Sequence, residues 1–156
     1  MNYKINQVDP SLAKRACEDI TIDLPEYFGI PEANEKYAHG MLLRTSFAAY
    51  SDANIIGLLT LEFPSENNVN IYWLAVKRQH QNNQVGKNLL LAAEKYCIDH
   101  HYTSLTVETV SPKMNDENYF KTYQFYTRCG FQPLFELKPY GPDLLMIYMI
   151  KLLSHR

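Results

Sequence analysis

The chain has 156 residues, of which 46% are hydrophobic and 21% charged, and its net charge at pH 7 is -2. This balance suits a globular protein with a sizeable core, and the small charge argues against a general nucleic-acid binder. The longest apolar run, residues 144–150, is too short to span a bilayer, so no membrane partner is expected. The 3 cysteines form no CxxC pair and the 5 histidines lack ligand spacing, which predicts neither a metal site nor a disulfide framework.

Hydrophobic periodicity divides the chain into strands and helices. In chain order it predicts a strand over residues 3–8, a helix that starts at residues 9–11, a short helix over 32–39, strands over 45–50, 55–63 and 69–76, a helix over 85–101, a strand over 105–110, a helix over 115–129, and strands over 131–137 and 144–152. Gly130 stands where a left-handed cap would end the last helix. The crossover helix makes the strands on either side of it parallel, whereas the other neighbours form hairpins.

These elements predict a single domain over residues 1–156. Its class is mixed α/β (α+β): a mostly antiparallel sheet that contains one parallel pair of strands and is flanked by helices.

The segment that joins strand 69–76 to helix 85–101 says most about function. The apolar strand stops at Val76, a polar loop follows, and an amphipathic helix begins near Val85. Backbone N–H groups are free in the first turn of a helix, and the helix dipole favours negative charge there. Gly86 has no Cβ, which lets the backbone approach phosphate oxygens. The segment therefore predicts a site for a phosphorylated cofactor.

Two segments, together with the element order, resemble the GCN5-related N-acetyltransferase (GNAT) superfamily. Residues 76–86 read VKRQHQNNQVG, against the family's typical V-x-P-x-x-R-G-x-G-x-G. They keep Gln81 and Gly86 of the core Q/R-x-x-G-x-G/A motif and have Gln84 where glycine is usual. Downstream, YTRCGF at residues 126–131 looks like the family's Y-x-x-x-G-F segment. The resemblance covers roughly residues 45–152 and implies transfer of an acetyl group from acetyl-CoA to a primary amine.

The resemblance also implies where acetyl-CoA binds. The pantetheine arm would take backbone groups of Leu74 and Val76, between two strands that splay apart. The pyrophosphate would lie on the loop that ends at Gly86, and an asparagine near position 118 would contact the pantetheine. The predicted cofactor-binding residues are Leu74, Ala75, Val76, Gln81, Asn82, Asn83, Gln84, Val85, Gly86, Lys87, Asn88, Asn118 and Tyr119.

Tyr126 is the predicted general acid. Its four-residue offset from Gly130 matches the family's frequent acid, and a phenol with a pKa of about 10 is protonated at neutral pH. It would protonate the departing CoA thiolate, while a backbone N–H at Leu74 holds the oxygen of the tetrahedral intermediate. Tyr123, one helical turn earlier, is the nearest alternative.

The sequence does not single out one residue as the general base. Many relatives have a glutamate at the position of Asn70, and an asparagine cannot take a proton. Glu108 and Glu62 are the substitutes, each acting directly or through a water, and a weakly basic amine would need no enzymic base.

The departures from the family pattern keep other functions open. Gln84 in the loop and Asn70 at the base position motivate a non-catalytic acyl-CoA-binding or sensing domain. An interaction module without a cofactor would require the loop match to be a coincidence. The acceptor is a small-molecule or peptide amine, and residues 26–28 and 138–142 are candidates to line its side of the site.

Location and assembly are also expectations at this point. The N-terminal residues lack the apolar stretch of a signal peptide, which predicts a cytoplasmic protein. Because exposed edges of the final strands often pair in the superfamily, the resemblance further suggests a homodimer.

Overall fold

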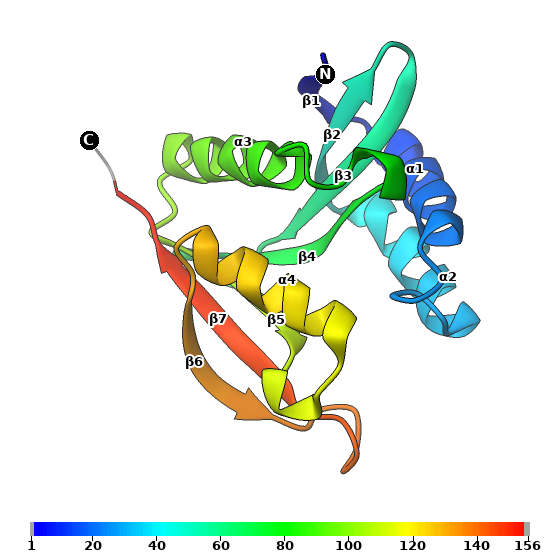
Figure 1. Cartoon of the computed structure of the whole chain (residues 1–156). Helices are drawn as coiled ribbons and strands as arrows, with labels where there is room; N and C mark the ends of the chain where they lie inside the picture. The colour runs from blue at the N-terminus through cyan, green and yellow to red at the C-terminus, as the bar shows by residue number, and fades with distance from the viewer. Residues whose placement is uncertain (1, 155–156) are drawn as a thin grey trace.

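The structure is a computed structural model that describes residues 2–154, and it contains the predicted elements in the predicted order (Figure 1). The strands are β1 (Lys4–Val8), β2 (Thr45–Ser51), β3 (Asn54–Glu62), β4 (Asn68–Val76), β5 (Ser104–Val110), β6 (Gln132–Leu137) and β7 (Met146–Leu152). The α-helices are α1 (Pro10–Asp23), α2 (Pro31–Gly40), α3 (Val85–Asp99) and α4 (Glu117–Arg128). Three short 3-10 helices are η1 (Met41–Leu43), η2 (Arg78–His80) and η3 (Pro112–Met114).

The strands form one sheet in the order β1-β2-β3-β4-β5-β7-β6. Every neighbouring pair is antiparallel except β4 and β5, which are parallel, as the crossover through α3 requires. The predicted fold class, a mostly antiparallel sheet with one parallel pair, is confirmed.

The parallel pair is joined along only half its length. Residues Asn68 to Ile71 of β4 pair with Ser104 to Val107 of β5, and the pairing stops there. Beyond that point β4 continues to Val76 beside β3 alone, and β5 continues to Val110 beside β7 alone. The sheet therefore opens between the second halves of β4 and β5.

Helices cover both faces of the sheet, with α3 and α4 on one face and α1 and α2 on the other (Figure 1). Successive residues of a strand point to opposite faces, and the two cores divide the strands accordingly. Leu59 packs in the core under α3 and α4, whereas its neighbour Leu58 packs in the core under α1 and α2. Both side chains are fully buried, and burial of a leucine contributes about 1.5–3 kcal/mol.

Several boundaries differ from those predicted, for local reasons. The helix expected to reach residue 101 ends at Asp99, because His101 adopts a left-handed φ of 67°. The helix expected from residue 115 begins at Glu117, because Asn115 is left-handed and Asp116 caps the helix. Gly130 has a φ of 95°, the left-handed conformation predicted for it. Within the part of the chain that the structure describes, no helix has the length and apolar character of a membrane span.

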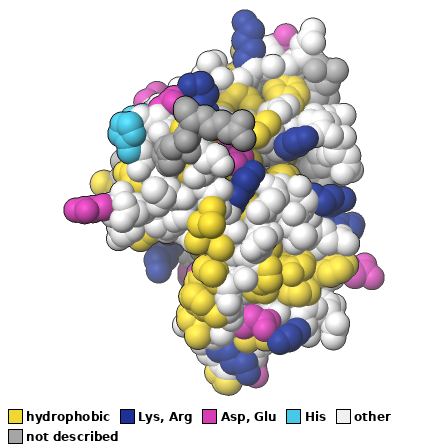
Figure 2. Space-filling view, turned by 90° about the vertical axis from the view of Figure 1, so that its left-hand side faces the viewer, with side chains coloured by type: hydrophobic (Ala, Val, Ile, Leu, Met, Phe, Trp, Pro, Cys, Tyr) yellow, Lys and Arg dark blue, Asp and Glu magenta, His cyan; other side chains and the backbone are white. Residues whose placement is uncertain are grey.

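The face that carries β6 exposes several hydrophobic side chains. Figure 2 shows this side of the molecule, with hydrophobic side chains gathered over its lower half. On β6, at the edge of the sheet, Leu134, Phe135 and Leu137 are each about half exposed.

Candidate active site

A groove of about 780 Å³ lies at the opening of the sheet, with the end of β4 on one side and α4 on the other. Its volume lies within the range of ligand and cofactor sites. Its walls come from the end of β4, from the loop before α3, from one face of α4 and from the loop between α1 and α2. The lining residues are Leu24, Glu26, Tyr27, Phe28, Leu74, Ala75, Val76, Arg78, His80, Gln81, Asn82, Gln84, Val85, Gly86, Lys87, Asn118, Lys121, Thr122, Phe125, Tyr126, Arg128 and Cys129.

One end of the groove is the N-terminus of α3. Its N-cap, Gln84, is left-handed with φ 65° and ψ 10°, and its side chain makes no capping hydrogen bond. Asn82 is also left-handed, with φ 64°. Alternation of ordinary and left-handed residues turns successive N–H groups toward one concave side, and such nests bind anions. The predicted phosphate loop therefore has a backbone suited to a pyrophosphate.

The charges around the groove also fit an anionic ligand. Arg78, Lys87, Lys121 and Arg128 line it, although the chain as a whole is slightly acidic. Arg78 is held by Glu26 at 2.7 Å, whereas no ion pair within residues 2–154 involves the other three. A concentration of cations in a cleft raises the local potential for phosphates.

Gly86 has a packing role that the motif does not reveal. A Cβ at this position would lie 3.3 Å from two ring carbons of Phe125 and 3.8 Å from Val76. The glycine therefore makes room for the Phe125 ring, which itself lines the groove. Next to it, the Gln81 side-chain amide donates to the Val76 carbonyl at 3.0 Å and ties the loop to the end of β4.

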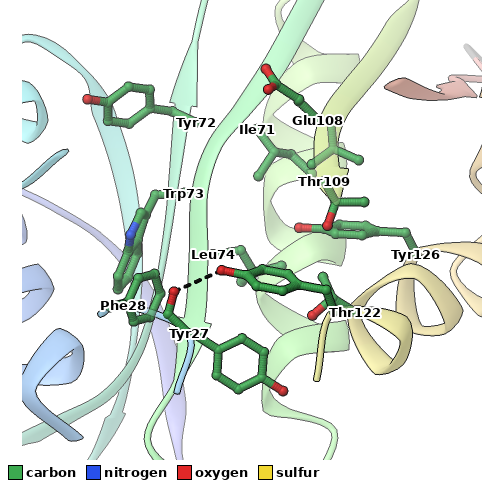
Figure 3. Close-up of a pocket in the computed structure, with 12 residues that line it drawn as sticks. Tyr27, Phe28, Ile71, Tyr72, Trp73, Leu74, Glu108, Thr109, Thr122 and Tyr126 are labelled. Carbon is green, nitrogen blue, oxygen red and sulfur yellow. Dashed lines mark hydrogen bonds between the residues drawn. The ribbon is translucent and has the colours of Figure 1, made fainter. Parts of the chain in front are cut away.

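The groove continues into a smaller chamber of about 130 Å³ between β4 and β5 (Figure 3). Phe28 and Trp73 lie on one side of it, opposite Tyr126 and Thr109 on the other. The lining residues are Tyr27, Phe28, Ile71, Tyr72, Trp73, Leu74, Val107, Glu108, Thr109, Tyr119, Thr122 and Tyr126. Five residues line both the groove and the chamber: Tyr27, Phe28, Leu74, Thr122 and Tyr126. These five mark the junction of the two spaces.

Tyr126 is positioned at this junction by aromatic packing. Its ring makes edge contacts with Phe125 and Phe131 at centroid distances of 5.2 and 5.3 Å, and the residue is 4% exposed. Burial, and after it the nearby Cys129 thiol, raises the pKa of Tyr126 well above its usual value. The phenol is therefore neutral at physiological pH and has a proton to donate. Tyr123, the alternative acid, packs against the core and lines neither space.

The loop between α1 and α2 closes one side of the chamber. The Tyr119 hydroxyl donates to the Tyr27 carbonyl at 2.8 Å, and the Tyr27 hydroxyl donates to the Asn118 carbonyl at 3.3 Å. Phe28, the next residue of the loop, stacks on Trp73 with the ring centroids 5.3 Å apart. These contacts attach the loop both to α4 and to β4, across the opening of the sheet.

The two candidate bases have different surroundings. Glu62 accepts hydrogen bonds from Arg44 at 3.2 Å and from Asn70 at 2.8 Å, and it lines neither space. Glu108 lines the chamber, and its buried Oε1 has no hydrogen-bond partner within residues 2–154. Burial, and after it the Glu108 carboxylate, raises the pKa of both Tyr140 and Tyr148. The turn of residues 138–142 thus brings Tyr140 close to Glu108.

The structure brings most of the predicted site residues together, but not all. Three of the predicted cofactor-binding residues do not line the groove. Asn83 accepts from the Tyr3 hydroxyl through its carbonyl, and the Asn88 amide donates to the same hydroxyl. Tyr119 lines the chamber instead of the groove. Their proposed contacts with the cofactor remain predictions.

Sequence reasoning found Asn118 and Tyr126 but missed most of the α4 wall of the groove. Lys121, Thr122, Phe125 and Arg128 lie on the face of α4 that Asn118 begins. Lys121 and Thr122 lie three and four residues after Asn118, and Phe125 and Arg128 follow at the same kind of spacing, which places them on one side of a helix. Extension of the predicted contact at Asn118 along the helix would have found them.

Taken together, the opening of the sheet, a helix N-terminus suited to an anion and the buried phenol at the junction are the features expected of an acyltransferase that takes a nucleotide-bearing thioester. The sequence comparison agrees, because residues 14–131 match the model of the acetyltransferase (GNAT) family. The chain therefore belongs to the GNAT family of acetyltransferases, for which acetyl-CoA is the acyl donor.

Solved structures show the same fold. Ard1 from Thermoplasma volcanium is 18% identical, with a TM-score of 0.77 over 99% of this chain and 100% of that one. The aminoglycoside 6'-N-acetyltransferase from Enterococcus faecium is 18% identical, with a TM-score of 0.75 over 98% of each chain. A Bacillus anthracis structure in complex with acetyl coenzyme A is 22% identical, with a TM-score of 0.62 over 71% of this chain and 63% of that one. No curated protein matches the chain.

Proposed function

We propose that this protein transfers the acetyl group of acetyl-CoA to a primary amine, with the cofactor in the groove and the acceptor in the chamber. The observation that carries this is the continuity of the two spaces at Leu74 and Tyr126. A thioester in the groove and an amine in the chamber would meet beside a neutral phenol. We further propose that residues 1–156 form one such catalytic domain.

In the proposed reaction, the amine nitrogen attacks the thioester carbon and a C–N bond forms. The backbone N–H of Leu74 stabilises the negative charge that develops on the carbonyl oxygen. When the C–S bond breaks, Tyr126 donates its proton to the departing thiolate, and the extra proton on the attacking nitrogen replaces the one that Tyr126 has given up. The proton that the ammonium must lose before attack passes to Glu108, the one carboxylate that lines the chamber. Glu62 is the weaker candidate for base, because Arg44 and Asn70 already occupy its carboxylate.

The cofactor site can be tested by binding. Lys121→Glu reverses a charge on the groove wall, and we expect it to weaken acetyl-CoA binding in isothermal titration by about tenfold or more. Lys36→Glu makes the same change on α2, outside both spaces, and is the matched control. If both variants bind acetyl-CoA as the unchanged protein does, the groove is not the cofactor site.

Catalysis is tested by release of the CoA thiol across a panel of primary amines. An increase over the rate without amine supports the transferase. Tight acetyl-CoA binding with no transfer to any amine would support the alternative, a non-catalytic acyl-CoA-binding domain, which Gln84 in the loop and Asn70 at the base position motivate.

We also propose that the β6 edge mediates a homodimer. The edge is apolar, with Leu134, Phe135 and Leu137 exposed (Figure 2). Light scattering of the purified protein measures the mass, and a monomer at 100 μM or above would contradict this proposal.

A further inference from the structure

The chamber has three properties that together constrain the acceptor: its size, its walls and its charge. Its volume of about 130 Å³ is close to that of an engineered cavity that holds benzene, roughly 150 Å³. Aromatic rings supply much of the wall, from Tyr27, Phe28, Tyr72, Trp73, Tyr119 and Tyr126. A space of this size takes one aromatic ring or one unbranched alkyl chain, and excludes a fused or bulky ring system.

The charge of the chamber is a single carboxylate. Of the twelve lining residues, Glu108 is the one that is an Asp, Glu, Lys, Arg or His. Its Oε1 is buried and accepts no hydrogen bond from the described residues. A buried carboxylate oxygen without a donor is costly, because desolvation is not compensated. A positive charge bound in the chamber beside Glu108 would reduce that cost.

Figure 3 shows how this carboxylate lies relative to the rings. Glu108 and Tyr72 lie at the same end of the view, with the Tyr72 ring directed away from Glu108, and Trp73, Phe28 and Tyr126 lie farther from that end. Faces of aromatic rings attract cations, and a carboxylate among them adds the ion pair. Tyr148, the register partner of Glu108 on β7, and Tyr140 bring two phenols to the Glu108 side chain.

Glu62, the other candidate base, differs from Glu108 because an arginine neutralises it. Among the described residues, Glu108 is therefore the one unpaired carboxylate at the chamber. Glu62 lies on β3, which β4 separates from β5, and Arg44 balances it at 3.2 Å. The same guanidinium lies 3.8 Å from the Tyr72 ring centroid. A second ammonium group of a polycation would therefore find no second unbalanced carboxylate within the chamber.

We propose that the acceptor presents a slim arm with one primary ammonium, either an unbranched alkyl chain or a single ring on a short chain, and that Glu108 receives this ammonium. The inference rests on the transferase function proposed above and names the substrate class of that site. Such an arm occurs in free alkyl- and arylalkylamines and in the lysine side chain of a peptide, and the two sources share this chemistry.

The first test is a comparison of kcat/KM among acceptors. We expect n-pentylamine, 2-phenylethylamine and an Nα-blocked lysine peptide to include the best acceptor, at least tenfold above 1-adamantylamine, which is bulky, and kanamycin, which is polycationic. The ratio of the free amines to the peptide then identifies the source of the arm. A preference for either control acceptor would overturn the inference and leave the transferase function standing.

The second test separates recognition of charge from a structural effect. Glu108→Gln keeps the shape of the side chain, and we expect it to raise KM for 2-phenylethylamine by tenfold or more. It should leave KM for aniline, which is neutral at the assay pH, and the Kd for acetyl-CoA within about twofold. Glu136→Gln is the matched control, because that carboxylate lies on β6 and is paired with Lys113 at 2.7 Å. An equal loss with charged and neutral amines would overturn the role of Glu108, whereas loss of acetyl-CoA binding in the unchanged protein would instead overturn the proposed function.

Discussion

At the scale of single residues, Tyr126 carries the strongest chemical prediction. Tyr126→Phe removes the hydroxyl but keeps the ring that packs on Phe125 and Phe131. Loss of a general acid costs about 10²–10⁴ in rate, so we expect kcat to fall at least about 100-fold while the Kd for acetyl-CoA changes little. Tyr123→Phe, one turn earlier and outside both spaces, should leave kcat within about twofold. Full turnover by the Tyr126 variant would remove it from the mechanism.

The raised pKa of Tyr126 also predicts the shape of the pH profile. Burial keeps the phenol protonated beyond the ordinary tyrosine value of about 10, so deprotonation of the acid should not limit the rate below that pH. Because the acceptor must lose its proton, kcat/KM should rise from neutral pH toward about 9. A decline between pH 7 and 9 in the unchanged protein, absent from Tyr126→Phe, would contradict this assignment.

Gln84 predicts a change in stability with a definite sign. It holds a left-handed conformation, with φ 65°, which costs a residue with a Cβ about 1–2 kcal/mol. Gln84→Gly removes that strain, and part of the gain is offset by greater freedom of the unfolded chain. We expect a net stabilisation of about 0.5 kcal/mol and a rise in Tm of about 1–2 °C by calorimetry.

The matched control is a glycine substitution that should destabilise the protein instead of stabilising it. Gln124 is exposed within α4, where glycine costs about 1 kcal/mol relative to a good helix former. Gln124→Gly should therefore lower Tm. If Gln84→Gly lowers it equally, the Gln84 side chain makes a contribution that outweighs its backbone strain.

At the scale of elements, α4 is the part whose position the site depends on most. Asp116 caps it by accepting from the N–H groups of Asn118 and Tyr119, at 3.0 and 3.2 Å. Loss of such a cap costs about 1 kcal/mol. Because the first turn of α4 also binds the loop at Tyr27, Asp116→Ala should lower both Tm and the affinity for acetyl-CoA.

The chain offers a second cap as a control. Asp9 accepts from the Leu12 N–H at 3.0 Å and begins α1, and none of residues 10–23 lines the groove or the chamber. Asp9→Ala should lower Tm by a similar amount and leave acetyl-CoA affinity unchanged in titration. Equal effects of the two variants on affinity would mean that general stability, not the position of α4, controls the site.

The elements also show how far the sequence could predict this protein. Periodicity and caps predicted each strand and α-helix within a few residues, because those signals are local. The phosphate loop could be predicted as well, since its chemistry lies in consecutive residues. The chamber could not, because Tyr27 and Tyr119 are 92 residues apart and meet only in the folded chain. Likewise, the crowding of Gly86 by Phe125 depends on the packing of α4 beside α3 and has no signature in either segment alone.

At the scale of the whole molecule, the sheet has two halves, β1 to β4 and β5 to β7. The short pairing between β4 and β5 connects them. Four residue pairs connect these strands, and past Ile71 the halves separate. A cofactor in the groove contacts the end of β4 on one side and α4 on the other. Binding of the cofactor should therefore stabilise the end of β4 and α4, and should also strengthen the connection between the two halves of the sheet.

This arrangement predicts a linked change in stability and in local protection. At a concentration 100 times its Kd, a ligand that binds only the folded state adds about 2.7 kcal/mol, or about 5–10 °C in Tm for a chain of this size. Hydrogen exchange should slow in residues 72–76 of β4 and in the first turns of α4 together, while α1, outside the groove, changes little. Slowing at the N-terminus of α3 alone would mean that only the phosphate end is bound. Slower hydrogen exchange in both β4 and α4 would mean that the cofactor bridges the gap that the divergence of β4 and β5 leaves in the sheet.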